Sequence, residues 1–134
     1  MSEEEVCKMV AQANYQVNNL AEKIQEIISG SGKCCHQVRV KPYPSDPNGF
    51  TLQAPKAFAW PLWQGSKKRL KIEVKKRWAD KLGLTKSADS ISSKGNFTEP
   101  AVYWYLAPDD DYVKNLGKVA AILAWVCETR HHDC

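Results

Sequence analysis

The sequence predicts an α+β fold, in which a mostly antiparallel sheet of four or five strands is flanked by an N-terminal and a C-terminal helix. Apolar residues recur with helical spacing at both ends of the chain, whereas in the middle they alternate with polar residues. Most connections in the middle are also too short for parallel crossovers. The 134 residues, of which 43% are hydrophobic and 25% charged, fit one domain over residues 1–134.

The first expected element is a helix over residues 2–29. Ser2 and Glu5 have the spacing of a capping box, and glutamates in the first turn suit the positive end of the helix dipole. Gly30 and Gly32 predict where the helix ends. The apolar positions form one stripe: Val6, Met9, Val10, Ala13, Val17, Leu20, Ala21, Ile24, Ile27 and Ile28.

A β-meander is expected over residues 34–106. The clearest half-buried strand is Arg69 to Lys75, where Leu70, Ile72 and Val74 alternate with polar residues. Three prolines predict a loop over 42–49, and the segment 85–98, rich in Ser, Lys and Gly, predicts another. The remaining expected pieces are strands at 37–41, 50–53, 57–60 and 101–106, and a short helical turn at 78–82 closed by Gly83.

A second helix is expected over residues 108–130, followed by a tail over 131–134. Pro108 and the acids Asp109 to Asp111 suit a first helical turn. We expect these acids to stabilise the helix dipole rather than to bind a cation.

Charge is distributed unevenly along the chain. Residues 67–86 hold nine basic and two acidic residues, whereas residues 1–30 and 108–134 are net acidic. Alternation predicts one basic strand face with Glu73 in its middle, and Arg39 or Lys41 on another strand would extend it. The basic residues that share this face are Arg69, Lys71, Lys75 and Arg77.

This face favours a non-enzymatic binding module that contacts nucleic acid or an acidic protein partner. Basic side chains would hold phosphates and nearby aromatic rings would stack on bases. A solvated strand face, on which lysines prevent aggregation, is the alternative. We expect Trp63, beside Gln64 and Gly65, to be exposed at a loop tip, where it would suit a small protein-binding inhibitor or subunit. The aromatic residues concerned are Trp60, Trp63, Trp78, Tyr103 and Tyr105.

A metal-dependent nuclease or hydrolase is the enzymatic alternative. Glu73 and Lys75 have the E-x-K spacing of some nucleases, with Asp46 as the available upstream carboxylate. The chain has no phosphate-binding glycine loop, dinucleotide fingerprint, nucleophile elbow or zinc-protease motif. We therefore assign no catalytic residue and expect no cofactor.

Cysteine and histidine cluster at two places in the chain. A zinc site would use Cys127 and His131, four residues apart on a helix, together with Cys34 or Cys35. The alternative is that Cys127 acts as a small buried hydrophobe and His131 belongs to a frayed tail. We favour the alternative, because the chain contains no CxxC pair.

The same composition predicts a cytoplasmic protein with no membrane partner. No run of 18 apolar residues is present, and Met1 is followed by serine and glutamates rather than by a secretory signal. Five cysteines, an odd number, favour reduced thiols.

A set of segments spread over the predicted meander and the second helix forms one pattern: Phe58-Ala59-Trp60, Leu70 to Val74, Lys94 to Phe97, Asp109 to Asp111 and Leu116 to Ala124. Together these segments resemble a small bacterial domain of unknown function, formerly labelled a predicted transport protein and found near restriction-modification components. The resemblance covers roughly residues 15–127 and implies a helix, a meander and a terminal helix, but no catalytic residues. The Cys/His clusters and the Trp60 to Trp63 segment depart from that domain.

Overall fold

The structure, a computed structural model, confirms the α+β fold in a single domain and describes residues 2–30, 37–43, 45–95, 98–109 and 111–130. One antiparallel sheet of six strands, slightly more than expected, has the order β1-β2-β3-β4-β6-β5. The elements are α1 (Glu3–Gly30), β1 (Arg39–Tyr43), β2 (Asp46–Gln53), β3 (Ala57–Gln64), β4 (Arg69–Lys75), α2 (Lys76–Lys81), a 3-10 turn (Thr85–Ser87), β5 (Ser90–Ser92), β6 (Ala101–Leu106) and α3 (Tyr112–Arg130).

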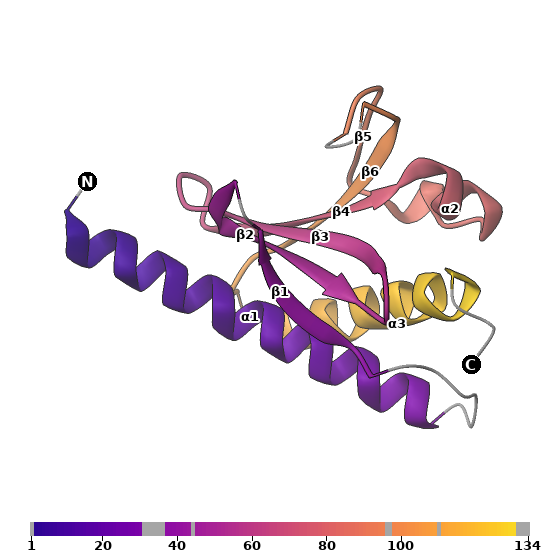
Figure 1. The fold of residues 1–134 in the computed structure, drawn as a ribbon, viewed down its shortest axis with the longest axis horizontal. Coiled ribbons are helices and arrows are strands. Elements are labelled where there is room, and N and C mark those ends of the chain that lie inside the picture. Colours follow the sequence, from indigo (N-terminus) through magenta and orange to yellow (C-terminus); the bar gives the residue numbers. More distant parts are fainter. Residues whose placement is uncertain (1, 31–36, 44, 96–97, 110, 131–134) are drawn as a thin grey trace.

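Both long helices pack on the same side of the sheet (Figure 1). The buried stripe of α1, including Val17, Leu20 and Ile24, joins one hydrophobic core with the helix-facing side chains of the sheet and with α3. On β4 the residues that enter this core are Leu70, Ile72 and Val74. The side chains of the intervening residues of each strand therefore lie on the opposite face of the sheet.

The start of α1 confirms the capping prediction. The hydroxyl of Ser2 accepts a hydrogen bond from the N–H of Glu5 at 3.2 Å, and three glutamates occupy the first turn. The exit from α2 also follows the expectation, because Gly83 adopts the left-handed conformation at φ 70°.

The start of α3 differs from the prediction. The helix begins at Tyr112 rather than at residue 108, because the carboxylate of Asp109 accepts the N–H of Asp111 at 3.0 Å in a turn ahead of the helix. Asp109 and Asp111 therefore precede the first helical turn. The predicted tail 131–134 lies outside the described residues.

Three strand boundaries also differ. The predicted loop 42–49 is largely part of the β1–β2 hairpin, since Pro42 sits on an edge strand, where a missing N–H costs little. Strand β3 continues through Pro61 to Gln64, with Trp63 paired to Leu70. The predicted loop 85–98 contains the 3-10 turn and β5, which pairs Ser90 with Tyr103.

Candidate functional site

The candidate site is the face of β3, β4 and β6 that points away from α1 and α3, which we call the open face. Register places two rows of three side chains across it. One row is Leu62, Lys71 and Tyr105, and the other is Trp60, Glu73 and Tyr103. Alternation along β4 adds Arg69 and Lys75 to this face, as the sequence predicts.

Two cations of β4 lie over two tyrosines of β6. The guanidinium carbon of Arg69 is 3.6 Å from the ring centre of Tyr105, and Nζ of Lys71 is 4.9 Å from that of Tyr103. The Nε–H of Arg69 also donates to Oε1 of Gln64 at 2.7 Å, which orients the guanidinium. Each contact is a cation–π interaction worth roughly 0.5–1 kcal/mol at an exposed site. The two pairs give the open face alternating positive and aromatic groups.

The other end of the open face is built around two tryptophans. Trp60 and Trp78 stack with ring centres 6.2 Å apart and an angle of 16° between the planes. Nζ of Lys75 lies 5.0 Å from the ring centre of Trp78, and the guanidinium carbon of Arg77 lies 5.6 Å from it. Arg77 belongs to the helix α2 and not to β4, so its predicted place on the strand face is wrong, because the strand ends at Lys75.

Glu99 neutralises part of this tryptophan end. Its carboxylate lies 3.2 Å from Nε of Arg77 and 3.8 Å from Nζ of Lys75. The side chain of Arg77 is 63% exposed, so its pair with Glu99 contributes little to stability. The main consequence of Glu99 is electrostatic, because its carboxylate offsets the charges of Lys75 and Arg77, which the sequence predicts on the basic face.

Glu73 occupies the centre of the open face and is only 4% exposed. Gly95 covers it, because a Cβ at residue 95 would lie 3.2 Å from Oε2 of Glu73. Burial raises the pKa of Tyr103, and the neighbouring negative charge of Glu73 raises it further. The phenol of Tyr103, over whose ring Lys71 lies, is therefore harder to ionise than that of a free tyrosine.

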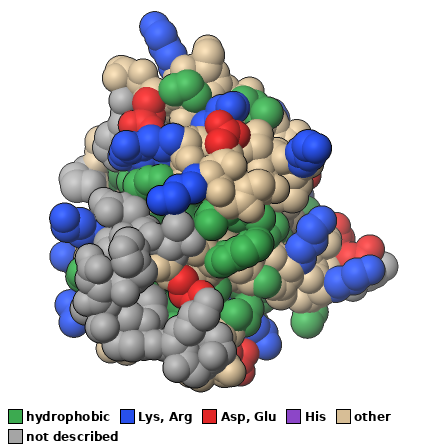
Figure 2. All heavy atoms as spheres, turned by 90° about the vertical axis from the view of Figure 1, so that its right-hand side faces the viewer, with side chains coloured by type: hydrophobic (Ala, Val, Ile, Leu, Met, Phe, Trp, Pro, Cys, Tyr) green, Lys and Arg blue, Asp and Glu red, His purple; other side chains and the backbone are tan. Residues whose placement is uncertain are grey.

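The turn between β3 and β4 adds exposed cations to the Arg69 end. Lys67 and Lys68 follow Gln64 and Gly65 there, and Lys68 adopts a left-handed φ of 48°. Figure 2 shows the opposite end of the molecule, where α2 lies. Its Lys and Arg side chains are spread out, with hydrophobic side chains between them.

Two predicted binding residues are placed elsewhere. Trp63 is only 3% exposed and packs in the hydrophobic core, so the predicted loop-tip position is wrong. The strand continues past it, which turns its side chain toward the helices. Lys41 is exposed on β1, three strands away from β4, and does not lie beside Arg69 or Lys71.

Some residues of the site could not be identified from the sequence. Glu99 carries no sequence signal, and Gly95 belongs to the Lys94 to Phe97 segment, for which the sequence predicts a loop and no site. Both lie against β4 because β6 pairs with it. Ser90 is a further example: its hydroxyl lies 2.8 Å from that of Tyr105 and steadies the ring under Arg69.

The candidate metal ligands are mostly outside the described residues. Cys34, Cys35 and His131 fall there, whereas Cys127 is fully buried in the core side of α3. Glu73 and Asp46 of the nuclease hypothesis lie on β4 and β2, which β3 separates. Within the described part of the chain, no three His, Cys, Asp or Glu side chains are grouped so that they could hold a metal ion.

Among the helices of the described segments, none is long and apolar enough to cross a membrane. Comparison of the chain with the models of known protein families, with curated proteins and with solved structures finds no match. The resemblance noted from the sequence therefore stays an expectation.

Proposed function

We propose that the chain is a binding module that engages single-stranded nucleic acid on the open face, at the end that holds Arg69 and Lys71. The observation that supports this most directly is the pair of cations stacked over Tyr105 and Tyr103. Proteins that bind single strands combine a positive surface with aromatic rings on which bases stack.

The open face suits a single strand better than a duplex. Sheet surfaces that carry aromatic side chains bind unpaired bases, which can lie flat on the rings. The planar guanidinium of Arg69 already covers Tyr105, so a base that stacks there meets either the guanidinium plane or the ring. The ammonium of Lys71 would hold the adjacent phosphate.

The positions of the carboxylates favour the end with Arg69 and Lys71 as the site for nucleic acid. Glu99 pairs with Lys75 and Arg77 at the tryptophan end. The described carboxylates form no ion pair with the cations of the other end, which are Lys67, Lys68, Arg69 and Lys71. Phosphate binding is therefore expected along the β3–β4 turn and the first half of β4.

Fluorescence anisotropy with short labelled oligonucleotides tests the proposal. Oligothymidine, oligouridine and a duplex of equal length are titrated at several salt concentrations, with the single strands expected to bind more tightly. Replacing Arg69 and Lys71 together by glutamine is expected to reduce the slope of log affinity against log salt by roughly 0.7–1.4, at about 0.7 per lost phosphate contact. The lower value applies if Arg69 only stacks on a base, and the upper value if it also contacts a phosphate.

The matched control removes the same charge elsewhere. Lys114 and Lys118 are exposed on α3, on the other side of the sheet, and their double replacement by glutamine leaves the net charge equal to that of the first variant. Equal losses in the two variants, or no salt-sensitive binding by the wild-type chain, would contradict the proposal.

A further inference from the structure

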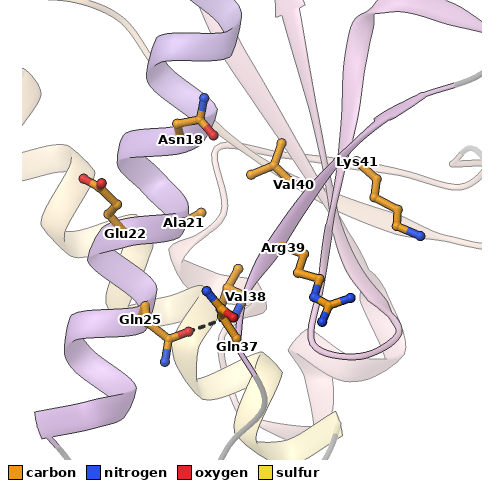
Figure 3. A pocket seen from close by; sticks show the side chains of 9 residues that line it. All are labelled: Asn18, Ala21, Glu22, Gln25, Gln37, Val38, Arg39, Val40 and Lys41. Atoms are coloured by element: carbon orange, nitrogen blue, oxygen red, sulfur yellow. Dashed lines mark hydrogen bonds between the residues drawn. The ribbon is translucent and has the colours of Figure 1, made fainter.

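A second candidate site lies between α1 and the edge strand β1. A groove of about 560 Å³ separates the helix from the strand, within the size range of ligand sites. Figure 3 shows that side chains from both elements surround it. Its lining residues are Asn18, Ala21, Glu22, Gln25 and Gln37 to Lys41.

The backbone of β1 presents hydrogen-bonding groups to this groove. The N–H of Val38 points away from β2, since it donates to Oε1 of Gln25 on α1 at 2.8 Å (Figure 3). The carbonyl of Lys41 points the other way, because it accepts the hydroxyl of Thr51 on β2. Along an antiparallel edge strand, the N–H and C=O of successive residues point alternately toward the neighbouring strand and away from it. The N–H and C=O of Val40 therefore point away from β2, to the groove.

The side chains of β1 divide between the two faces of the sheet. Val38, which directly precedes β1, and Val40 are partly buried against the core, on the side of α1. Arg39 and Lys41 are exposed, and Figure 3 shows both pointing away from the helix. A strand added beside β1 would thus meet apolar neighbours on one face and cations on the other.

A second copy of the chain is a poor occupant of this edge. Pairing β1 with another β1 would bring Arg39 and Lys41 of the two copies close together, and like charges on paired strands are destabilising. Basic side chains are one feature by which edge strands avoid self-association. Pro42 offers no N–H to any added strand, so the backbone pairing of a partner segment depends on Val40.

We propose that β1 receives an extended segment of a partner protein in which acidic and apolar residues alternate. The backbone of the segment pairs with the outward N–H and C=O of Val40. Its acidic side chains lie beside Arg39 and Lys41, while its apolar side chains enter the groove over Ala21.

Binding of synthetic peptides tests this inference. The probe is a labelled peptide of alternating glutamate and valine, compared with a peptide of the same composition in which the glutamates are contiguous and with an alternating lysine–valine peptide. Only the first is expected to bind measurably. Equal binding of the contiguous peptide would overturn the inference, because it would show attraction by charge alone.

Two variants of Val40 separate the contribution of its backbone N–H to peptide binding from that of its side chain. Val40→Pro removes the outward N–H, and proline is tolerated on edge strands at such positions; it is expected to weaken peptide binding about tenfold. Val40→Ala retains the N–H and is the control. Equal affinities of the two variants, each verified as folded by its thermal unfolding, would overturn the inference.

Charge reversal gives a second, independent result. Replacing Arg39 and Lys41 by glutamate is expected to abolish binding of the acidic peptide and to create binding of the lysine–valine peptide. Unchanged preference would overturn the inference, and so would a concentration-dependent dimer, seen by analytical ultracentrifugation, that Val40→Pro dissociates.

The double variant in which glutamine replaces Arg69 and Lys71 tests whether the peptide binds at β1 or on the open face. That variant is expected to bind the acidic peptide with unchanged affinity even if nucleic-acid binding is lost. If the variant loses the peptide while Val40→Pro retains it, the peptide binds the open face and the inference is wrong.

Discussion

Arg69 on β4 and Tyr105 on β6 form a cation–π pair, with the guanidinium carbon 3.6 Å from the ring centre. Two further hydrogen bonds fix this pair. Gln64 accepts from the Nε–H of Arg69, and the hydroxyl of Ser90 lies 2.8 Å from that of Tyr105. The ring and the guanidinium are thus held in place before any ligand arrives, which lowers the entropy cost of binding.

The first prediction concerns the ring of Tyr105. Tyr105→Leu removes the stacking surface and is expected to weaken binding of oligouridine by about tenfold, at the lower end of the 1–3 kcal/mol reported per stacked base. Tyr105→Phe keeps the ring, loses the contact with Ser90, and is expected to retain affinity within about threefold. Anisotropy titrations of both variants measure the difference, and similar losses in both would show that the ring does not stack.

The second prediction concerns Glu99. Glu99→Gln leaves Lys75 and Arg77 without this carboxylate and is expected to tighten oligonucleotide binding and steepen its salt dependence. Stability is expected to change by about 1 kcal/mol, since Arg77 is exposed whereas Lys75 and Glu99 are partly buried. Glu26→Gln on α1 removes the same charge far from the open face and serves as the control. An equal gain in the control would point to net charge alone.

The third prediction uses the raised pKa of Tyr103. The folded protein holds the phenol neutral, because of burial first and the charge of Glu73 second, whereas the unfolded chain ionises it near pH 10.0. The stabilising contribution is thus complete below that pH and is lost as the pH rises through the higher pKa of the folded state. Urea unfolding from about pH 8 to about pH 11 is expected to show a smaller loss of stability in Tyr103→Phe than in the wild-type chain. Identical pH profiles would show that Tyr103 is not coupled to folding.

The sequence predicted the elements with strong periodicity and missed those set by pairing. The buried stripe of α1 and the alternation of β4 were each visible because their period repeats over several turns or residues. Pro42 and Pro61 each predict the end of a strand, yet Pro42 pairs with Phe50 and Pro61 pairs with Ile72. Pro42 is tolerated because β1 is an edge strand.

The site was predictable in part for a related reason. Arg69, Lys71 and Lys75 follow from alternation along one strand. The sequence predicts Tyr103 and Tyr105 near the basic face, but their place under the cations depends on the pairing of β6 with β4, two strands that are far apart in the sequence. Trp63 is a residue whose predicted exposure is wrong, because β3 continues past Trp60 to Gln64 and buries its side chain. The sequence carries no signal for the length of this strand.

The last prediction concerns the close approach of Gly95 to the open face. A Cβ at this position would lie 2.6 Å from the Cβ of Ala101, which is buried, and would also press on the carboxylate of Glu73. Gly95→Ala is therefore expected to lower the free energy of unfolding by about 1–3 kcal/mol, measured by urea denaturation.

Gly117 provides the matched control for Gly95. It lies within α3, where an added Cβ would meet nothing within 4 Å. Because alanine is the better helix former, Gly117→Ala is expected to raise the free energy of unfolding by up to about 1 kcal/mol. If Gly95→Ala lowers the free energy of unfolding and Gly117→Ala raises it, the steric contact of the added Cβ with Ala101 and Glu73 explains why only glycine fits at residue 95. A neutral Gly95→Ala would show that the segment moves away from β6 at little cost, and that Glu73 is accessible from the open face.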